Sequence, residues 1–237
     1  HCGGVDNIFP HHENEIAQST AATGEPFVNY WLHNEHLLVD NQKMSKSLDN
    51  FYTLRDLLDR NLSPEAIRYT LISTHYRQKL NFTFDKVSAS QRAINRLREL
   101  KRRFLLVKSD TGIDLVKHCE QVKVNFSEKL GDDLNISGGL GELFSWVNQM
   151  FSMLDRNEIS KTGALNGVET LNRIDLVLGV IEEKQDSCDE IESLIQQRET
   201  ARKEKNWKHA DEVRNQLEQM GIVLEDTPTG TIWKKKT

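Results

Sequence analysis

Apolar residues in the middle of the chain recur at the spacing of an α-helix, and this pattern constrains the fold more than any other feature of the sequence. The residues that share it are Leu140, Leu143, Phe144, Val147, Phe151 and Leu154. Steps of three and four residues place all of them along one face of a helix. Such a face must be covered by other helices, so the stripe predicts the core of a helical bundle and not a cofactor site.

The composition is that of a helix-rich globular protein with a modest core. The chain has 237 residues, of which 37% are hydrophobic and 28% are charged. No run approaches the roughly 20 apolar residues of a membrane helix, so we expect no membrane contact.

The three cysteines, Cys2, Cys119 and Cys188, are odd in number and far apart. This argues against a disulfide framework and for a reducing cytoplasm, where we expect a monomer.

The net charge of −5 conceals a basic segment between Asp85 and Lys108. Eight of its residues are basic and two are acidic. The basic residues are Lys86, Arg92, Arg96, Arg98, Lys101, Arg102, Arg103 and Lys108. A local basic stripe on an acidic protein fits contact with phosphate groups. A solvated helix face explains the same composition equally well.

The first third of the chain combines α and β patterns. Residues 1–50 contain a Gly-rich loop, a helix from about His11 and an apolar strand in "EHLLVD". The segment 52–80 is predicted to be helical, with a break near residues 61–64. Ser63 can cap a helix and Pro64 suits its first turn, so a second helix is expected to start there.

The rest of the chain is predicted to be helical up to a short β-hairpin. An extended segment at 79–85 precedes a basic helix at 86–107. Further helices fill 112–185, with a polar hinge at 156–167. In the last fifty residues two helices, the second ended by Gly221, precede a hairpin turned by "TPTG". The expected fold is therefore mostly α with a partial α/β segment.

Two short motifs carry chemistry. The segment "FPHHENEIAQS" places four side chains that can bind metal at a helix start, where acidic residues alone would also be favoured by the helix dipole. "KMSKS", from Lys43 to Ser47, follows about thirty residues later and leads directly into helices. Considered alone, this five-residue segment would be interpreted as a solvated loop.

"KMSKS" in this setting resembles the second nucleotide-binding motif of class I aminoacyl-tRNA synthetases. Amino-acid activation builds negative charge on the α-phosphate of ATP, and a lysine placed on that charge stabilises the transition state more than the ground state. The resemblance implies that Lys46 contacts the ATP phosphates with help from Lys43. Met44 and Ser45 would belong to the same ATP-binding loop.

"HCGGVDNIFPHHENEIAQS" is similar to a segment typical of cysteinyl-tRNA synthetases. The resemblance implies that His11 and Glu15 bind zinc, and their spacing puts both on one helix face, with His12 pointing elsewhere. Zinc would bind the thiolate of substrate cysteine and reject the hydroxyl of serine. His1 and Asp6 match positions near the amino-acid pocket, where Asp6 would hold the substrate ammonium. A satisfied loop histidine and a capping aspartate are the alternatives.

The tail "ARKEKNWKHADEVRNQLEQMGIVLEDTPTGTIWK" resembles the anticodon-binding module of the same family. By that match Arg202, Trp207, Asp211 and Asp226 read anticodon bases. An aromatic ring for stacking and carboxylates that accept from exocyclic amines suit single-stranded RNA. Trp207 could instead be a core aromatic of a helical hairpin, and Asp211 could merely decorate its surface.

The resemblance implies four parts and one reaction. The parts are the end of a Rossmann catalytic domain with the zinc-site helix and KMSKS loop at 1–50, a tRNA stem-contact region with the basic helix at 51–110, a helical bundle at 111–187, and an anticodon-binding helical hairpin plus β-hairpin at 188–237. The reaction is that of a cysteine–tRNA ligase. It activates L-cysteine with ATP and Mg²⁺ and transfers it to the 3′ end of cysteine tRNA.

The sequence departs from the family pattern at Cys2 and Asp49, where glycine is usual. A preceding half with the first ATP motif and two further zinc ligands is also expected, so the chain by itself is expected to be inactive. Two other functions stay open. A ligase that joins cysteine to a small amine would share the zinc and "KMSKS" parts but lack an anticodon module. An isolated tRNA-binding fragment would have no use for either motif.

Overall fold

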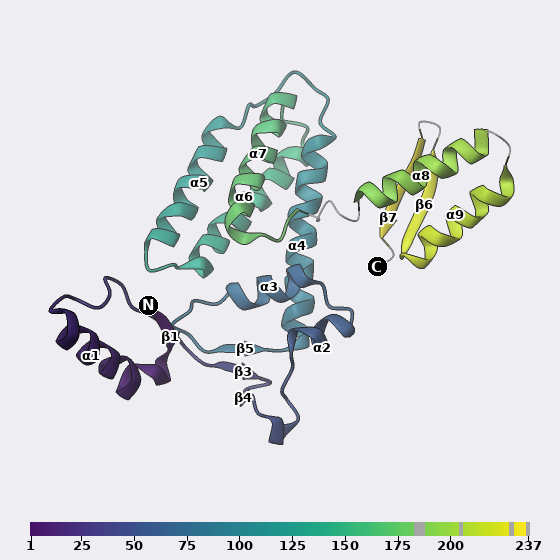
Figure 1. Cartoon of the computed structure of the whole chain (residues 1–237). Coiled ribbons are helices and arrows are strands. Elements are labelled where there is room, and N and C mark those ends of the chain that lie inside the picture. The colour runs from purple at the N-terminus through teal and green to yellow at the C-terminus, as the bar shows by residue number, and fades with distance from the viewer. Residues whose placement is uncertain (183–187, 204–205, 228–229, 236–237) are drawn as a thin grey trace. The chain divides into compact units, whose positions relative to one another are not determined.

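Helices dominate the computed structural model, which describes residues 1–182, 188–203, 206–227 and 230–235. The chain divides into two units, His1–Glu182 and Glu183–Thr237 (Figure 1). The first unit starts with short strands and continues as helices, and the second has two helices and a strand pair. The predicted fold class, mostly α with a partial α/β segment, is confirmed.

Short strands and one helix make up the α/β segment. They are β1 (Cys2–Gly4), α1 (Glu13–Thr23), β2 (Leu32–Asn34), β3 (Leu37–Val39), β4 (Gln42–Lys43) and β5 (Leu80–Phe82). β1 pairs with β2 in parallel, and β3 lies between antiparallel β4 and parallel β5. The strand predicted in "EHLLVD" is β3. These pairings bring the start of the chain and the KMSKS loop onto the edges of two small sheets.

The helical segment after the KMSKS loop breaks where the sequence predicts. α2 spans Leu54–Asp59, and α3 spans Pro64–Ile72 with Ser63 Oγ accepting a hydrogen bond from the third residue of the helix. The prediction that helix continues to residue 80 is wrong. The chain leaves α3 after Ile72 because the following loop is bonded elsewhere.

Asp133, between two bundle helices, holds that loop. Arg77 Nε donates to Asp133 Oδ2 at 2.6 Å, and the Tyr76 hydroxyl donates to Oδ1. The hydrogen bonds from Arg77 and then Tyr76 keep the pKa of the Asp133 carboxyl below its usual value. These bonds join the α/β segment to the bundle.

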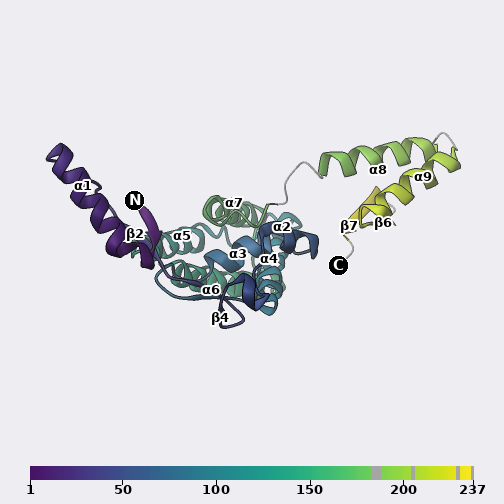
Figure 2. The ribbon, with the colours of Figure 1, turned by 60° about the horizontal axis from the view of Figure 1, so that its bottom comes forward.

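Four helices form the bundle of the first unit, seen nearly end-on in Figure 2. They are α4 (Phe84–Leu105), α5 (Val116–Gly131), α6 (Ile136–Asp155) and α7 (Lys161–Leu178). The apolar stripe that the sequence places on α6 lies in the core, with Leu143 and Val147 fully buried and Phe144 and Phe151 packed against them. The same core runs from α2 to the end of α7, across the predicted boundary between 51–110 and 111–187.

The polar hinge predicted at 156–167 is wrong in its second half, because α7 begins there. Ser160 caps this helix by accepting from the N–H of Gly163 at 3.1 Å. A Cβ on Gly167 would lie 2.6 Å from Cε2 of buried Phe104. Gly163 and Gly167, which contributed to the hinge prediction, are thus the places where α7 approaches its neighbours closely.

Side chains also fix the backbone that leaves α7. The carboxylate of buried Asp175 accepts hydrogen bonds of 2.8 to 3.0 Å from the N–H groups of Val180, Ile181 and Glu182. Arg68 Nε donates to the carbonyl of the last α7 residue at 2.6 Å. Backbone groups at a helix end lack partners within the helix, and here other parts of the first unit supply them.

The second unit packs α8 (Cys188–Lys203) beside α9 (Trp207–Gln219), followed by antiparallel β6 (Ile222–Thr227) and β7 (Gly230–Lys235) (Figures 1 and 2). Its core contains Leu194, Val213, Leu217 and Ile222. Gly221, with φ +74°, ends α9 as predicted, and the predicted hairpin is confirmed. The centre of its turn, 228–229, lies outside the described residues. None of the described helices has the length and apolarity to cross a bilayer.

The close approach at Gly167 generates a prediction about stability. Gly167→Ala is expected to lower the free energy of unfolding by about 1–3 kcal/mol, because the added methyl group overpacks the Phe104 ring. Gly141→Ala is the control, since its Cβ meets nothing within 4 Å on the exposed side of α6. That variant is expected to gain about 0.5–1 kcal/mol from reduced backbone entropy. Urea unfolding monitored by circular dichroism distinguishes the two variants. Equal changes in the free energy of unfolding would contradict the packing argument.

Candidate functional site

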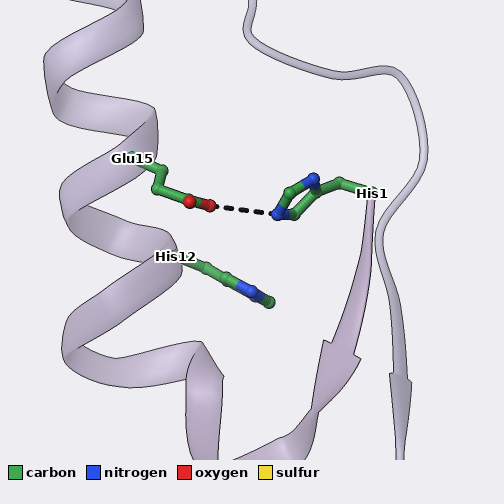
Figure 3. Close-up of side chains that lie close together, drawn as sticks. All are labelled: His1, His12 and Glu15. Carbon is green, nitrogen blue, oxygen red and sulfur yellow. Dashed lines mark ion pairs between the residues drawn. The ribbon is translucent and has the colours of Figure 1, made fainter.

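Three side chains near the start of the chain form a cluster that can bind a metal ion. His1 precedes β1, and His12 and Glu15 lie at the start of α1 (Figure 3). One ligand atom from each lies within 4.8 Å of the other two. His1 Nε2 and Glu15 Oε2 lie 3.0 Å apart. Two imidazoles and a carboxylate are a donor set that zinc and other divalent transition metals accept.

The backbone before α1 determines which histidine faces this cluster. Residues Ile8–His12 lead irregularly into the helix, with Phe9 in an extended conformation at φ −130° and ψ 131°. His12 is only 4% exposed, and its Nδ1 lies 2.8 Å from Nε2 of His33 on β2. A Cβ on Gly3 would lie 2.6 Å from the His12 ring, so β1 passes the ring closely because residue 3 is glycine. The expectation that His12 points away from Glu15 is wrong, since residues three apart also share a helix face.

His11 lies on the solvent side of the same carboxylate. Its side chain is 63% exposed, and its Nε2 is 3.4 Å from Glu15 Oε1. Glu15 thus presents one oxygen toward His11 and the other toward His1. His33, which orients the ring of His12, escaped the sequence analysis because nothing in "WLHNEH" marks one histidine as a partner of a residue twenty-one positions earlier.

Glu15 Oε2 shows that the cluster fits a cation. This oxygen is buried, and the contact with His1 does not have hydrogen-bond geometry, so Oε2 has no hydrogen-bond partner among the described residues. A buried carboxylate oxygen without a partner is costly. A positive ion bound by this carboxylate and a neighbouring imidazole would remove that cost, and His1, His11 and His12 all lie beside Glu15, so the residues present fit zinc.

The other residues expected near the amino-acid pocket lie close to this cluster along the chain. Asp6 is exposed in the short turn Val5–Asn7 that follows β1. Cys2, one of the departures from the family pattern, is an exposed free thiol in β1.

The KMSKS loop begins at the end of β4. Lys43 is exposed, Met44 and Ser45 are half-buried, and Lys46–Leu48 form a 3₁₀ turn. The side chain of Lys46 lies outside the described part of the structure. Asp49 has φ +51°, so it adopts the left-handed conformation that glycine favours. The position that is usually glycine therefore has a positive φ here with aspartate in its place.

The basic segment of α4 is largely occupied by bonds within the protein. Arg96 donates to Asn148 at 2.7 Å, and Arg103 pairs with Asp155 at 2.7 Å. Arg102 binds Glu99 through two hydrogen bonds, which lower the pKa of the Glu99 carboxyl. The charges that suggested phosphate contact therefore join α4 to itself and to α6.

Arg98 has the most specific role of these residues. Its Nε donates to the carbonyl of Ile181 at 3.0 Å and its Nη2 to the carbonyl of Val180 at 3.2 Å. Arg98 thus supports the same backbone that Asp175 caps. The side chains of Lys86 and Arg92, by contrast, make neither an ion pair nor a hydrogen bond within the described ranges.

The expected anticodon residues lie on the second unit. Trp207, at the start of α9, is 60% exposed, so the alternative that it is a core aromatic is wrong. Asp211 is exposed on α9, between buried Ala210 and buried Val213, and Arg202 is exposed near the end of α8. Asp226 lies in β6, with its side chain outside the described residues. An exposed aromatic ring at a helix start is available for stacking on a base.

Family models match both ends of the chain. The model "tRNA synthetases class I (C) catalytic domain" covers residues 1–92, and the model "Cysteinyl-tRNA ligase anticodon binding domain" covers residues 185–233. The chain belongs to the cysteinyl-tRNA synthetase family. The two matches include the KMSKS loop, the metal-ligand cluster and the exposed Trp207.

Relatives in this family match the chain along its length. Cysteine–tRNA ligase of Brachyspira hyodysenteriae is 49% identical over 100% of the chain, and that of Chlamydia caviae is 47% identical over 99%. Cysteine–tRNA ligase of Leptospira interrogans is 47% identical over 100% of the chain. The chain spans about half the length of these curated relatives, namely 52%, 50% and 52%.

A solved structure shows that the fold is that of a class I synthetase. The leucyl-tRNA synthetase of Agrobacterium radiobacter K84, solved in a ternary complex with tRNA and LeuAMS, aligns with a TM-score of 0.55. The alignment covers 72% of this chain and 24% of that chain at 16% identity. At this identity the likeness concerns the fold alone.

The bonds of Arg98 predict that it stabilises the first unit. Arg98→Ala is expected to lower the free energy of unfolding by about 1–3 kcal/mol, because two carbonyls at the end of the bundle lose a charged donor. Arg92→Ala is the matched control on the same helix and is expected to change stability by less than about 0.5 kcal/mol. Denaturant unfolding measures both, and equal effects would show that Arg98 is only a surface charge.

Proposed function

We propose that this chain supplies the KMSKS loop, part of the zinc site and the tRNA-binding units of a cysteine–tRNA ligase. The observation that carries the proposal is the presence, in one chain, of a class I catalytic match with its motifs and a cysteinyl-type anticodon-binding match. A ligase that joins cysteine to a small amine has no need of the second match.

The proposed reaction has two steps. The carboxylate of L-cysteine attacks the α-phosphate of ATP·Mg²⁺, which forms cysteinyl-adenylate and releases pyrophosphate. The 3′-terminal hydroxyl of cysteine tRNA then attacks the carbonyl of the adenylate and releases AMP. Lys46, assisted by Lys43, stabilises the charge that develops on the α-phosphate, while Met44 and Ser45 shape the loop around ATP. Asp6 holds the ammonium group of the substrate.

The zinc proposal assigns His11 and Glu15 as the ligands from this chain, with two further ligands in a preceding part of the polypeptide. Bound zinc would supply a soft cation for the thiolate of substrate cysteine, which a serine hydroxyl cannot match. The 3.4 Å separation of His11 Nε2 and Glu15 Oε1 supports a shared ion. His1, on the other oxygen of Glu15, orients the carboxylate and faces the substrate.

The second unit is proposed to read the anticodon. Trp207 stacks on a base, Asp211 and Asp226 accept from exocyclic amines, and Arg202 contacts a base edge or a phosphate. The exposure of the Trp207 ring supports this assignment. The complete enzyme works as a monomer in the cytoplasm, which suits the widely spaced cysteines.

Pyrophosphate exchange tests the function. A full-length protein that contains this sequence is expected to exchange labelled pyrophosphate into ATP only when cysteine is present, and the 237-residue chain alone is not. Lys46→Ala is expected to lower the exchange rate by a factor of about 10² or more, as loss of a charge-stabilising group does. Exchange that does not depend on cysteine would contradict the proposal.

The zinc content of the same preparations separates the candidate ligands. His11→Ala is expected to lose zinc, whereas His12→Ala is expected to retain it. The opposite result would assign the ligand role to the cluster of His1, His12 and Glu15 shown in Figure 3.

Trp207 provides a test of anticodon reading. Trp207→Ala is expected to weaken binding of cysteine tRNA by about 1–3 kcal/mol, the contribution of one base stacked on an aromatic ring. Met220→Ala, a partly exposed apolar residue after the same helix, is the control and is expected to bind normally. Filter binding measures affinity, and circular dichroism verifies folding. A folded Trp207→Ala variant with unchanged affinity would exclude stacking at this site.

A further inference from the structure

The side chain of Asn50 joins two points of the KMSKS loop. Its Oδ1 accepts a hydrogen bond from the Ser45 N–H at 2.8 Å, and its Nδ2 donates to the Lys43 carbonyl at 3.2 Å. We call this pair of bonds the asparagine clasp. A backbone N–H only donates and a backbone carbonyl only accepts, so making both bonds requires a carboxamide.

Met44, between the two bonded residues, is half-buried. It lines an apolar cavity of about 240 Å³ together with Leu37, Tyr52 and Phe82. The backbone that the asparagine clasp joins therefore also carries an apolar side chain that is partly withdrawn from water.

The rest of the loop is a short turn whose two ends meet at the clasp. Lys46–Leu48 form the 3₁₀ turn, with the Leu48 N–H donating to the Ser45 carbonyl at 3.3 Å. Asp49, with φ +51°, then reverses the chain into Asn50. Because Ser45 and Asn50 are bonded to each other, the segment that carries Lys46 is closed into a small ring. Such a ring has fewer backbone conformations than an open loop of the same length.

We propose that Asn50 is a positioning residue for amino-acid activation, which it serves by fixing the backbone from which Lys46 extends. This inference rests on the proposed function. Asn50 acts through the loop and does not itself contact the substrate. A lysine on a pre-ordered backbone requires less ordering when charge develops on the α-phosphate. Loss of the clasp should therefore affect kcat more than KM.

Hydrogen exchange of the Ser45 amide tests the clasp directly in the 237-residue chain. Asn50→Ala is expected to speed this exchange at least about tenfold, because the N–H loses its acceptor. Asn50→Asp keeps the acceptor oxygen and is expected to retain the protection of Ser45 while losing the bond to Lys43. Asn81→Ala is the control, since Asn81 Oδ1 accepts from the Asn41 N–H at 2.7 Å in the neighbouring turn.

Kinetics of the full-length enzyme test positioning. In cysteine-dependent pyrophosphate exchange, Asn50→Ala is expected to lower kcat at least about tenfold, with KM for ATP and for cysteine within about twofold. Asn50→Asp is expected to fall between this variant and the wild type. Asn81→Ala is expected to match the wild type. This separation of kcat from KM would not follow from a merely structural role.

The two measurements can overturn the proposal separately. Equal exchange of the Ser45 amide in wild type and Asn50→Ala would show that the clasp does not hold the loop. Faster exchange with unchanged kcat would show that the clasp exists but does not position Lys46. A wild-type enzyme without cysteine-dependent activity would overturn the proposed function and the positioning role together, while the amide measurement would still decide whether the clasp exists.

Discussion

The first unit depends on the apolar face of α4. Ile94, Leu97 and Leu100 have no exposed surface, and α3, α6 and α7 all pack against this helix. Each such side chain contributes about 1.5–3 kcal/mol when it leaves water. The polar side of the same helix carries the arginines that bond to α6 and to the end of the bundle. One helix therefore organises both the core and the polar bonds that fix the surrounding helix ends.

Features that depend on neighbouring residues could be predicted from the sequence. Ser63 starts α3 and Gly221 ends α9, because caps act within one turn. The partner of Arg98 lies eighty-three residues away, and no local pattern reveals it. Gly163 and Gly167 were misread for the same reason. Glycine is typical of a hinge and of a close approach alike. The backbone of Ile113 and Asp114 beside Gly163, and the ring of Phe104 beside Gly167, decide for the close approach.

The same contrast between local pattern and distant contact applies to the candidate site. The spacing of His11 and Glu15 predicted their common helix face, and the structure places their side chains 3.4 Å apart. The burial of His12 depends on β1 and β2, which lie on either side of α1 in the sequence. Periodicity assumes a regular helix from the start of the segment, whereas the chain is extended at Phe9 before α1 begins. Tertiary contacts, and not the helical repeat, therefore determine which imidazole faces inward.

The bonds around the end of α7 have a consequence for how firmly the end of the first unit is held. Asp175, Arg68 and Arg98 satisfy backbone groups as far as Glu182 with side chains that all belong to the first unit. These backbone groups at the end of the bundle thus have hydrogen-bond partners within the first unit. The strength of this chain end is therefore set by side chains of α3, α4 and α7, and a change in any of the three alters how firmly residues 178–182 are held.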